Sequence, residues 1–285
     1  MFDYDKAFSR NIGWTLPEEQ QALRHKKVAI AGCGGVGCIH TLTLARLGIG
    51  KFALSDFDQF GIENFNRQVG ATMASIGRNK LDVTSEMLRN INPDVEISSF
   101  PDGISESNVD AFLAGVDLYV DSLDFFAIKA RRAVFAACAR LGIPAITAAP
   151  LGLGTAFLCF MPGHMSFEEY FGMQHANSEE EQYVRFYLGL APALLQSTYL
   201  VKPDMVNFAE KRGPSTIVGC TLSAGVAAGY ALKILLNRGE LVTVPHGLHF
   251  DSYRNKLKTT WMPFGHRNPW FRIKLALAKR KLGIS

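Results

Sequence analysis

The sequence predicts an α/β fold in which helices flank a mainly parallel β-sheet. Short apolar runs alternate with helical patterns through the first half of the chain, which is typical of parallel strands joined by helices. A glycine-rich segment joins the first of these runs to the first long helix. Two more short strand patterns follow a long helix near the C-terminus, and we expect antiparallel strands there. With 285 residues, 48% of them hydrophobic and 20% charged, the chain can bury a substantial core.

Each expected strand of the first half is a run of mainly apolar residues, and most of these runs are followed by a helical pattern. The expected strands are residues 27–31, 51–55, 95–100, 118–121, 144–148 and 154–160. The expected helices are residues 36–47, 79–90, 106–113 and 126–141. The last of these helices ends at Gly142, which tolerates the left-handed conformation of a helix C-terminus. This alternation predicts a Rossmann-like sheet.

The second half of the chain is less regular. Between residues 164 and 213 the periodicity weakens, and a segment of this length inside a compact domain predicts a crossover or a lid. We expect a helix rich in small residues over 214–236, short strands over 241–244 and 248–251, and a basic amphipathic helix over 268–282. These boundaries predict one domain over residues 1–251 and a basic extension over residues 252–285.

Charge and cysteine content exclude several function classes. The 30 Lys and Arg residues exceed the 26 Asp and Glu residues by four, too few to indicate a nucleic-acid-binding protein, although basic residues cluster after Arg254. Five cysteines do not form the framework of a disulfide-rich secreted protein and indicate reduced thiols in the cytoplasm. Residues 1–10 lack the apolar segment of a signal peptide. Residues 214–232 are long enough to span a membrane, but their small side chains favour packing in a soluble core.

A glycine-rich loop connects the first strand to the first long helix. Its sequence is Gly32-Cys33-Gly34-Gly35-Val36-Gly37. Glycines here allow a tight turn and let backbone N–H groups and the helix N-terminus approach phosphates. The loop therefore predicts a nucleotide site, but by itself it does not separate a dinucleotide from ATP.

Charged residues after the second strand favour ATP. Asp56 ends this strand, where a carboxylate can accept hydrogen bonds from ribose hydroxyls, and Asp58 lies two residues further on. Arg67 lies eleven residues after Asp56, and Lys80 thirteen residues after Arg67. Hydride transfer with NAD does not need this pair of cations, whereas nucleotidyl transfer must neutralise the charge of the departing pyrophosphate.

The order of these motifs resembles a known family. The segments GCGGVG, SDFD, NFNRQ, IGRNK, INPDV and DSLD have the order and spacing of the ThiF- and MoeB-type adenylyltransferases of the ubiquitin-activating enzyme superfamily. The similarity is strong over residues 7–150 and moderate over residues 214–236. It implies a nucleotidyltransferase that uses ATP and Mg²⁺.

The resemblance also implies a role for each matching residue. The residues that would bind the nucleotide are Gly32, Gly34, Gly35, Gly37, Asp56, Asp58, Asn66 and Gln68. The residues that would act in catalysis are Arg10, Arg67, Lys80 and Asp124. Arg67 and Lys80 would hold phosphates, and Asp124 would bind Mg²⁺, which prefers carboxylate and phosphate oxygens. Arg10 would reach the ATP of a neighbouring subunit, so the resemblance implies a homodimer.

The cysteines depart from the pattern of many relatives. No Cys-x-x-Cys pair is present, so we expect no structural zinc. No cysteine lies between Phe160 and Gly219, where relatives that form a thioester or persulfide carry their nucleophile, so we expect no covalent step in this chain. Cys220 begins the apolar helix, where it is either a buried side chain or a thiol activated by the helix N-terminus.

These observations predict adenylation of a carboxylate, with an acyl-adenylate and pyrophosphate as products. The carboxylate could belong to a ubiquitin-like or sulfur-carrier protein, to a peptide C-terminus, or to a small acid such as a modified tRNA nucleoside. Two alternatives stay open: an inactive nucleotide-binding scaffold, and an NAD-dependent oxidoreductase, which would leave both cations and Asp124 without a role. The basic tail could dock on its own domain or contact a partner, a nucleic acid or a membrane.

Overall fold

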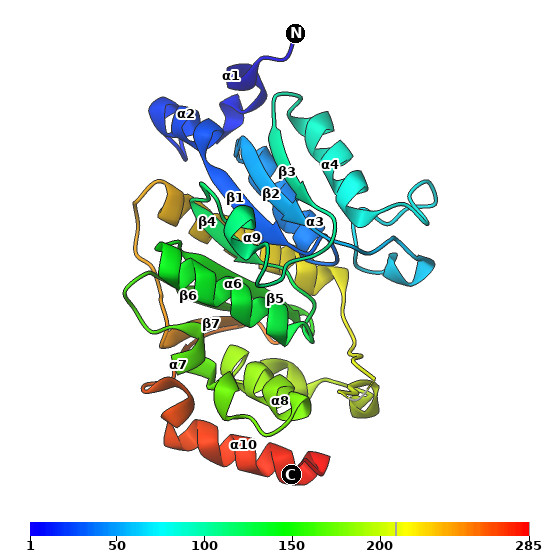
Figure 1. Ribbon diagram of the computed structural model, residues 1–285, viewed down its shortest axis with the longest axis vertical. Helices are drawn as coiled ribbons and strands as arrows, with labels where there is room; N and C mark the ends of the chain where they lie inside the picture. The colour runs from blue at the N-terminus through cyan, green and yellow to red at the C-terminus, as the bar shows by residue number, and fades with distance from the viewer. Residues whose placement is uncertain (209, 285) are drawn as a thin grey trace.

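The computed structural model describes residues 1–208 and 210–284, and its centre is one eight-stranded sheet (Figure 1). The strand order is β3-β2-β1-β4-β5-β6-β7-β8. The strands are β1 (Lys27–Ala31), β2 (Lys51–Ser55), β3 (Glu96–Phe100), β4 (Leu118–Asp121), β5 (Ala145–Leu151), β6 (Gly154–Phe160), β7 (His246–Asp251) and β8 (Lys256–Trp261).

The sheet has a parallel half and an antiparallel half. Strands β1 to β5 pair in parallel, and β5 to β8 pair antiparallel. Because β1 lies between β2 and β4, the direction of the crossovers reverses at the β1/β4 pair. Ala31 at the end of β1 is in register with Ser55 of β2 and Asp121 of β4, so the three strands end together. Parallel α/β sheets bind ligands outside the carboxyl ends of their strands at such a reversal.

Helices cover both faces of the sheet. The α-helices are α1 (Tyr4–Ala7), α2 (Pro17–His25), α3 (Gly37–Arg46), α4 (Lys80–Ile91), α5 (Val109–Phe112), α6 (Ile128–Leu141), α7 (Phe167–Phe171), α8 (Glu179–Leu190), α9 (Ile217–Leu235) and α10 (Pro269–Leu282). Successive residues of β1 face opposite sides of the sheet. Val28 and Ile30 join the core under α3, α4 and α9, whereas Ala29 and Ala31 join the core under α5 to α8.

The structure confirms the predicted fold class and corrects its C-terminal strands. The prediction of a strand over residues 241–244 is wrong, because Val242 donates its amide to the Tyr230 hydroxyl (3.2 Å) and only the Val244 amide reaches β6, at Cys159 O (3.0 Å). Pro245 then has no N–H to continue a ladder. The closing hairpin is β7 and β8, so the last strand lies beyond residue 251, within the segment assigned to the extension.

The irregular segment over residues 164–213 contains two packed helices. Phe167 of α7 and Phe186 of α8 are buried, with ring centroids 6.3 Å apart, in the core under α6. Residues 167–190 are therefore a layer of the fold. Between α8 and α9 the described residues form turns and two short 3-10 helices, Leu195–Thr198 and Pro203–Met205.

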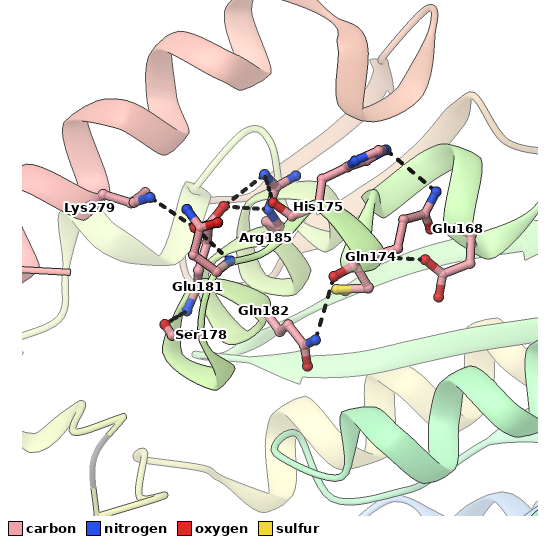
Figure 2. A network of polar contacts seen from close by, with 10 residues as sticks. Glu168, Gln174, His175, Ser178, Glu181, Gln182, Arg185 and Lys279 are labelled. Carbon is pink, nitrogen blue, oxygen red and sulfur yellow. Dashed lines mark hydrogen bonds and ion pairs between the residues drawn. The ribbon is translucent and has the colours of Figure 1, made fainter. Parts of the chain in front are cut away.

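The C-terminal helix α10 docks on α8, as Figure 2 shows. Phe271 and Leu275 of α10 are buried. The Lys279 Nζ atom lies 2.8 Å from a Glu181 carboxylate oxygen, and Arg185 binds the same carboxylate at 2.7 Å. Glu181 is 2% exposed, so two cations neutralise a buried anion between the helices. The inner face of the predicted basic helix therefore docks on its own domain.

Helix α9 occupies the centre of the fold. Among the described residues it is the one helix whose length and composition would allow it to cross a membrane. It packs against α3, β5 and β6. Ala227, Ala228 and Ala231 are buried in the core that it shares with β1, so the small side chains on this face allow close packing.

Candidate nucleotide site

The glycine-rich loop lies at the carboxyl end of β1 and passes close to β4. Gly32 has a φ of +96°, and a Cβ atom there would lie 2.3 Å from the backbone oxygen of Ser122. A Cβ atom at Gly37 would lie 1.7 Å from the Gly32 oxygen. Both positions therefore require glycine: a side chain at Gly32 would push the loop away from the residue after β4, and one at Gly37 would collide with the turn of the loop itself.

Asp56 holds the loop from the neighbouring strand. Its Oδ2 atom accepts the amide of Cys33 at 2.6 Å, and its Oδ1 atom accepts the amide of Asp58 at 2.8 Å. Burial raises the pKa of Asp56 above its ordinary value, while the two amides and the charge of Lys80 oppose this shift. Asp56 is half-buried, so its carboxylate is oriented by the loop and is still partly exposed.

Lys80 lies at the first position of α4 with its charge directed to Asp58. Its side chain is 8% exposed, and Nζ lies 3.0 Å from Asp58 Oδ2. The Lys80 amide also donates to Asp58 O at 2.9 Å. Asp58, whose side chain is 54% exposed, thus fixes the position of a buried ammonium group. Asp58, predicted from the sequence to bind the nucleotide, contacts Lys80 in the structure.

Arg67 and Gln68 lie against the glycine loop, and Asn66 joins them to the residues before α9. The Arg67 Nη1 atom donates to Glu63 O at 3.0 Å and to Asn66 Oδ1 at 2.9 Å, and Asn66 Nδ2 donates to Ser215 O at 2.9 Å. The Arg67 side chain passes Gly35, where an added Cβ atom would lie 3.7 Å from Arg67 Cγ. Gln68 is 6% exposed, and its Oε1 has no hydrogen-bond partner within the described residues.

A buried ion pair that the sequence analysis missed supports the loop after β4. Asp121 accepts Arg131 Nε at 2.8 Å, and the two side chains are 1% and 3% exposed. Arg131 also donates through Nη2 to Leu123 O (2.7 Å) and Asp124 O (3.1 Å). One feature of the sequence indicates this ion pair: Asp121 ends an apolar strand. A carboxylate buried at that position requires a cation beside it.

Asp124 lies exposed in this loop, with Oδ1 accepting the Phe126 amide at 2.9 Å. Within residues 1–208 and 210–284, no group of three His, Cys, Asp or Glu side chains forms a metal cluster. Mg²⁺ commonly takes one or two carboxylates and completes its shell with phosphates and water. An exposed carboxylate with its second oxygen uncommitted beside the glycine loop fits that requirement.

A cavity of about 640 Å³ adjoins the Asp124 loop. Residues 104–107, the first turn of α6 and part of α8 line it, together with Lys211. Phe126 belongs both to this cavity and to the turn that binds Asp124. The cavity therefore borders the loop that carries Asp124.

Arg10 and Cys220 have different surroundings. Arg10 is exposed in a 3-10 helix (Ser9–Asn11), and Asn11 Nδ2 donates to Arg46 O at 3.3 Å, at the end of α3 remote from the glycine loop. Arg10 therefore does not join the site of its own chain. Cys220 is buried. Its Sγ atom lies next to Gly35, where an added Cβ atom would be 3.3 Å from the sulfur. Burial raises its pKa, although Ser215 and Arg67 act in the opposite direction.

The glycine loop at the end of β1, with Asp56 bound to it and two cations nearby, defines an α/β nucleotide-binding protein. The chain belongs to the ThiF family, whose family model matches residues 8–269. It is 35% identical over 146 residues to tRNA threonylcarbamoyladenosine dehydratase of Haemophilus influenzae, covering 51% of this chain and 55% of that protein. It is 32% identical to the sulfur carrier protein ThiS adenylyltransferase of Escherichia coli, covering 50% and 56%. The chain thus spans about half the length of the curated relatives it matches.

Solved structures share the fold over a greater length. PaaA superposes with a TM-score of 0.69 and 18% identity, covering 90% of this chain and 82% of that chain. Escherichia coli MccB with ATP superposes with a TM-score of 0.68 and 22% identity, covering 90% and 70%. The Rossmann-like architecture with antiparallel C-terminal strands is therefore common to these proteins.

Proposed function

We propose that this protein is an ATP-dependent adenylyltransferase that activates a carboxylate. The observation that carries the proposal is the position of two cations near one glycine loop whose amides and helix N-terminus suit phosphates. Lys80 pairs with Asp58, two residues from the Asp56 that binds the loop, and the Arg67 side chain passes Gly35. An NAD-dependent oxidoreductase would use the loop and Asp56 but not the two cations. The relatives named adenylyltransferases support the same activity.

The proposed reaction is a displacement at the α-phosphorus of ATP. A carboxylate oxygen of the substrate forms a bond to this phosphorus as its bond to the bridging oxygen of pyrophosphate breaks. The products are an acyl-adenylate and pyrophosphate. Catalysis consists of alignment and charge neutralisation, because no proton has to move in this step.

Each group of the site has a part in this reaction. Asp56 accepts ribose hydroxyl hydrogen bonds, and the loop amides with Asn66 and Gln68 hold the phosphate chain. Lys80 exchanges its exposed counter-ion, Asp58, for a phosphate oxygen, and Arg67 stabilises the charge on departing pyrophosphate. Asp124 would hold Mg²⁺, which when bound neutralises phosphate charge.

We also propose that this chain forms no thioester or persulfide. All five cysteines are buried, and burial raises the pKa of Cys220 and the pKa of Cys159, the latter to about 12. A thiol in this state is a poor nucleophile near neutral pH. The acyl-adenylate would then pass directly to its acceptor.

A second copy of the chain would complete the site. Arg10 is exposed and remote from the glycine loop of its own chain. The segment between β2 and α4 carries exposed apolar side chains. These side chains are Phe57, Ile62, Phe65, Met73 and Ile76. We propose a cytoplasmic homodimer in which this surface is covered and Arg10 reaches the partner's ATP.

The substrate class is tested by ATP–pyrophosphate exchange against a panel of carboxylates. The panel contains a carrier protein ending in glycine, peptides with free and amidated C-termini, and tRNA with a carboxylate-bearing nucleoside. We expect exchange with one class, and its loss in Lys80→Ala but not in the neighbouring control Arg78→Ala, whose side chain pairs with Glu86. Calorimetry should show binding of ATP with Mg²⁺ but not of NAD. NAD binding, or ATP binding without exchange for any substrate, would favour the oxidoreductase or the scaffold.

A further inference from the structure

The charges of the chain are separated along its sequence. Residues 252–285 contain nine of the 30 Lys and Arg residues and none of the 26 Asp and Glu residues. The first 251 residues therefore contain 21 cationic and 26 anionic side chains. The C-terminal segment is strongly basic on a domain that is otherwise net acidic.

Helix α10 has two apolar faces, and only one is covered by its own domain. Phe271 and Leu275 are 3% and 7% exposed against the core beneath α8. Trp270, Ile273 and Leu277 are 73%, 50% and 63% exposed. At 100° per residue these three side chains lie within about 60° of the helix circumference, on the side opposite the buried pair. Figure 1 shows α10 beyond α8, at one end of the molecule.

The cations of α10 divide into those that bind the domain and those that stay exposed. Lys279 binds Glu181 (Figure 2). Lys274 Nζ donates to Pro192 O at 2.7 Å, so both lysines are used in docking. Arg272, Arg280 and Lys281 are exposed and form no ion pair within the described residues. Arg280 lies seven residues after Ile273, and Lys281 four residues after Leu277, so both border the exposed apolar stripe.

We propose that the outer face of α10 binds an anionic lipid surface. An apolar stripe with tryptophan at one end and cations along its edges is the pattern of a helix that lies in a membrane interface. The cations would meet lipid phosphates while Ile273 and Leu277 enter the acyl boundary. This surface lies at one end of the molecule, away from the start of α3 where the glycine loop ends (Figure 1), so the proposal does not depend on the proposed activity.

Two other occupants fit the same face less well. RNA would use the cations and could stack on Trp270, but it offers no apolar environment to the two aliphatic side chains. A second copy of α10 would offer no anion to Arg280 and Lys281, because residues 252–285 contain no Asp or Glu. An anionic lipid surface is the occupant that offers both phosphates to the cations and an apolar environment to Ile273 and Leu277.

The test is co-sedimentation of the full chain with vesicles. One set contains phosphatidylcholine alone, and the other contains phosphatidylcholine with about one-third phosphatidylglycerol. We expect binding to the anionic set, weakening as salt rises, with a blue shift of tryptophan emission that disappears in Trp270→Phe. The double variant Ile273→Ser/Leu277→Ser should bind at least about tenfold more weakly, because it removes the apolar contribution. Arg280→Glu/Lys281→Glu should also weaken binding.

Controls separate this proposal from its alternatives. Trp14→Ala removes another exposed tryptophan, 84% exposed and far from α10 in sequence, and should bind vesicles as the parent does. Circular dichroism checks that each variant keeps its fold. The proposal is overturned if anionic vesicles do not bind the protein, or if the serine double variant binds them unchanged. It is also overturned if that double variant abolishes only self-association, or if the glutamate variant abolishes only binding of a tRNA probe.

Discussion

Arg131→Met should destabilise the fold far more than the same change at the next residue. Arg131 is the cation of the buried pair with Asp121, and it also donates to the backbone oxygens of Leu123 and Asp124. The guanidinium carbon of Arg131 lies 4.4 Å from the centre of the Phe186 ring. Methionine keeps an apolar chain of similar length against this ring. The substitution therefore removes mainly charge and hydrogen bonds.

The magnitude follows from the burial of Asp121. Its side chain is 1% exposed, so loss of the cation leaves a carboxylate without solvent or counter-charge. Breaking a buried pair in this way costs about 3–5 kcal/mol of unfolding free energy. Arg132 pairs with Glu168, but these side chains are 35% and 29% exposed, and loss of such a pair costs about 0–1 kcal/mol.

Urea unfolding followed by circular dichroism measures both variants, and calorimetry measures their ATP affinity. We expect Arg131→Met to lose stability and ATP affinity, because the loop that carries Asp124 loses its support. The double variant Asp121→Asn/Arg131→Met should recover much of the stability, since no unpaired buried charge remains. Equal losses in Arg131→Met and Arg132→Met would refute the assignment of the buried pair as the support of this loop.

Three further predictions follow from the site and its surroundings. Gly32→Ala should abolish ATP binding, because its Cβ would meet Ser122 O at 2.3 Å, whereas Gly229→Ala, in open space on α9, should retain ATP binding and gain about 0.5–1 kcal/mol of stability. Burial lowers the pKa of His40 and the pKa of His249 to about 4. A histidine in the unfolded chain has a pKa near 6.5. As the pH falls from about 6.5 to 4, both histidines therefore bind protons in the unfolded chain but stay neutral in the folded chain. The unfolding free energy should then fall by on the order of 2 kcal/mol per histidine between about pH 7 and 5, and urea midpoints that are equal at both values would contradict this. Mixing Arg10→Ala with Lys80→Ala should restore exchange activity at one site of each mixed dimer, and subunit exchange without such recovery would show that each chain works alone.

Local patterns in the sequence predict most of the parallel half. β1, β2 and β4 follow from their apolar runs, and the glycine loop follows from the requirement for residues without a Cβ between a strand and a helix. These features depend on neighbours in the sequence, so pattern and propensity are sufficient to find them.

Tertiary partners determine the features that the sequence did not predict. Arg131 lies ten residues after Asp121, and nothing local shows that helix α6 returns its side chain to the end of β4. Strand β8 has an exposed, basic sequence that resembles a tail, and it is a strand because β7 offers it an edge. The ion pair of Lys80 with Asp58 likewise depends on how the loop between β2 and α4 folds.

The central claim, attack of a carboxylate on the α-phosphorus of ATP, is tested most directly by oxygen transfer. The substrate identified by pyrophosphate exchange is labelled with ¹⁸O in its carboxylate and incubated with the protein, ATP and the acceptor, and the released AMP is analysed by mass spectrometry. We predict that AMP carries one labelled oxygen, because the attacking carboxylate oxygen stays on phosphorus when the acyl group leaves. Unlabelled AMP, formed at the same rate, would contradict the account.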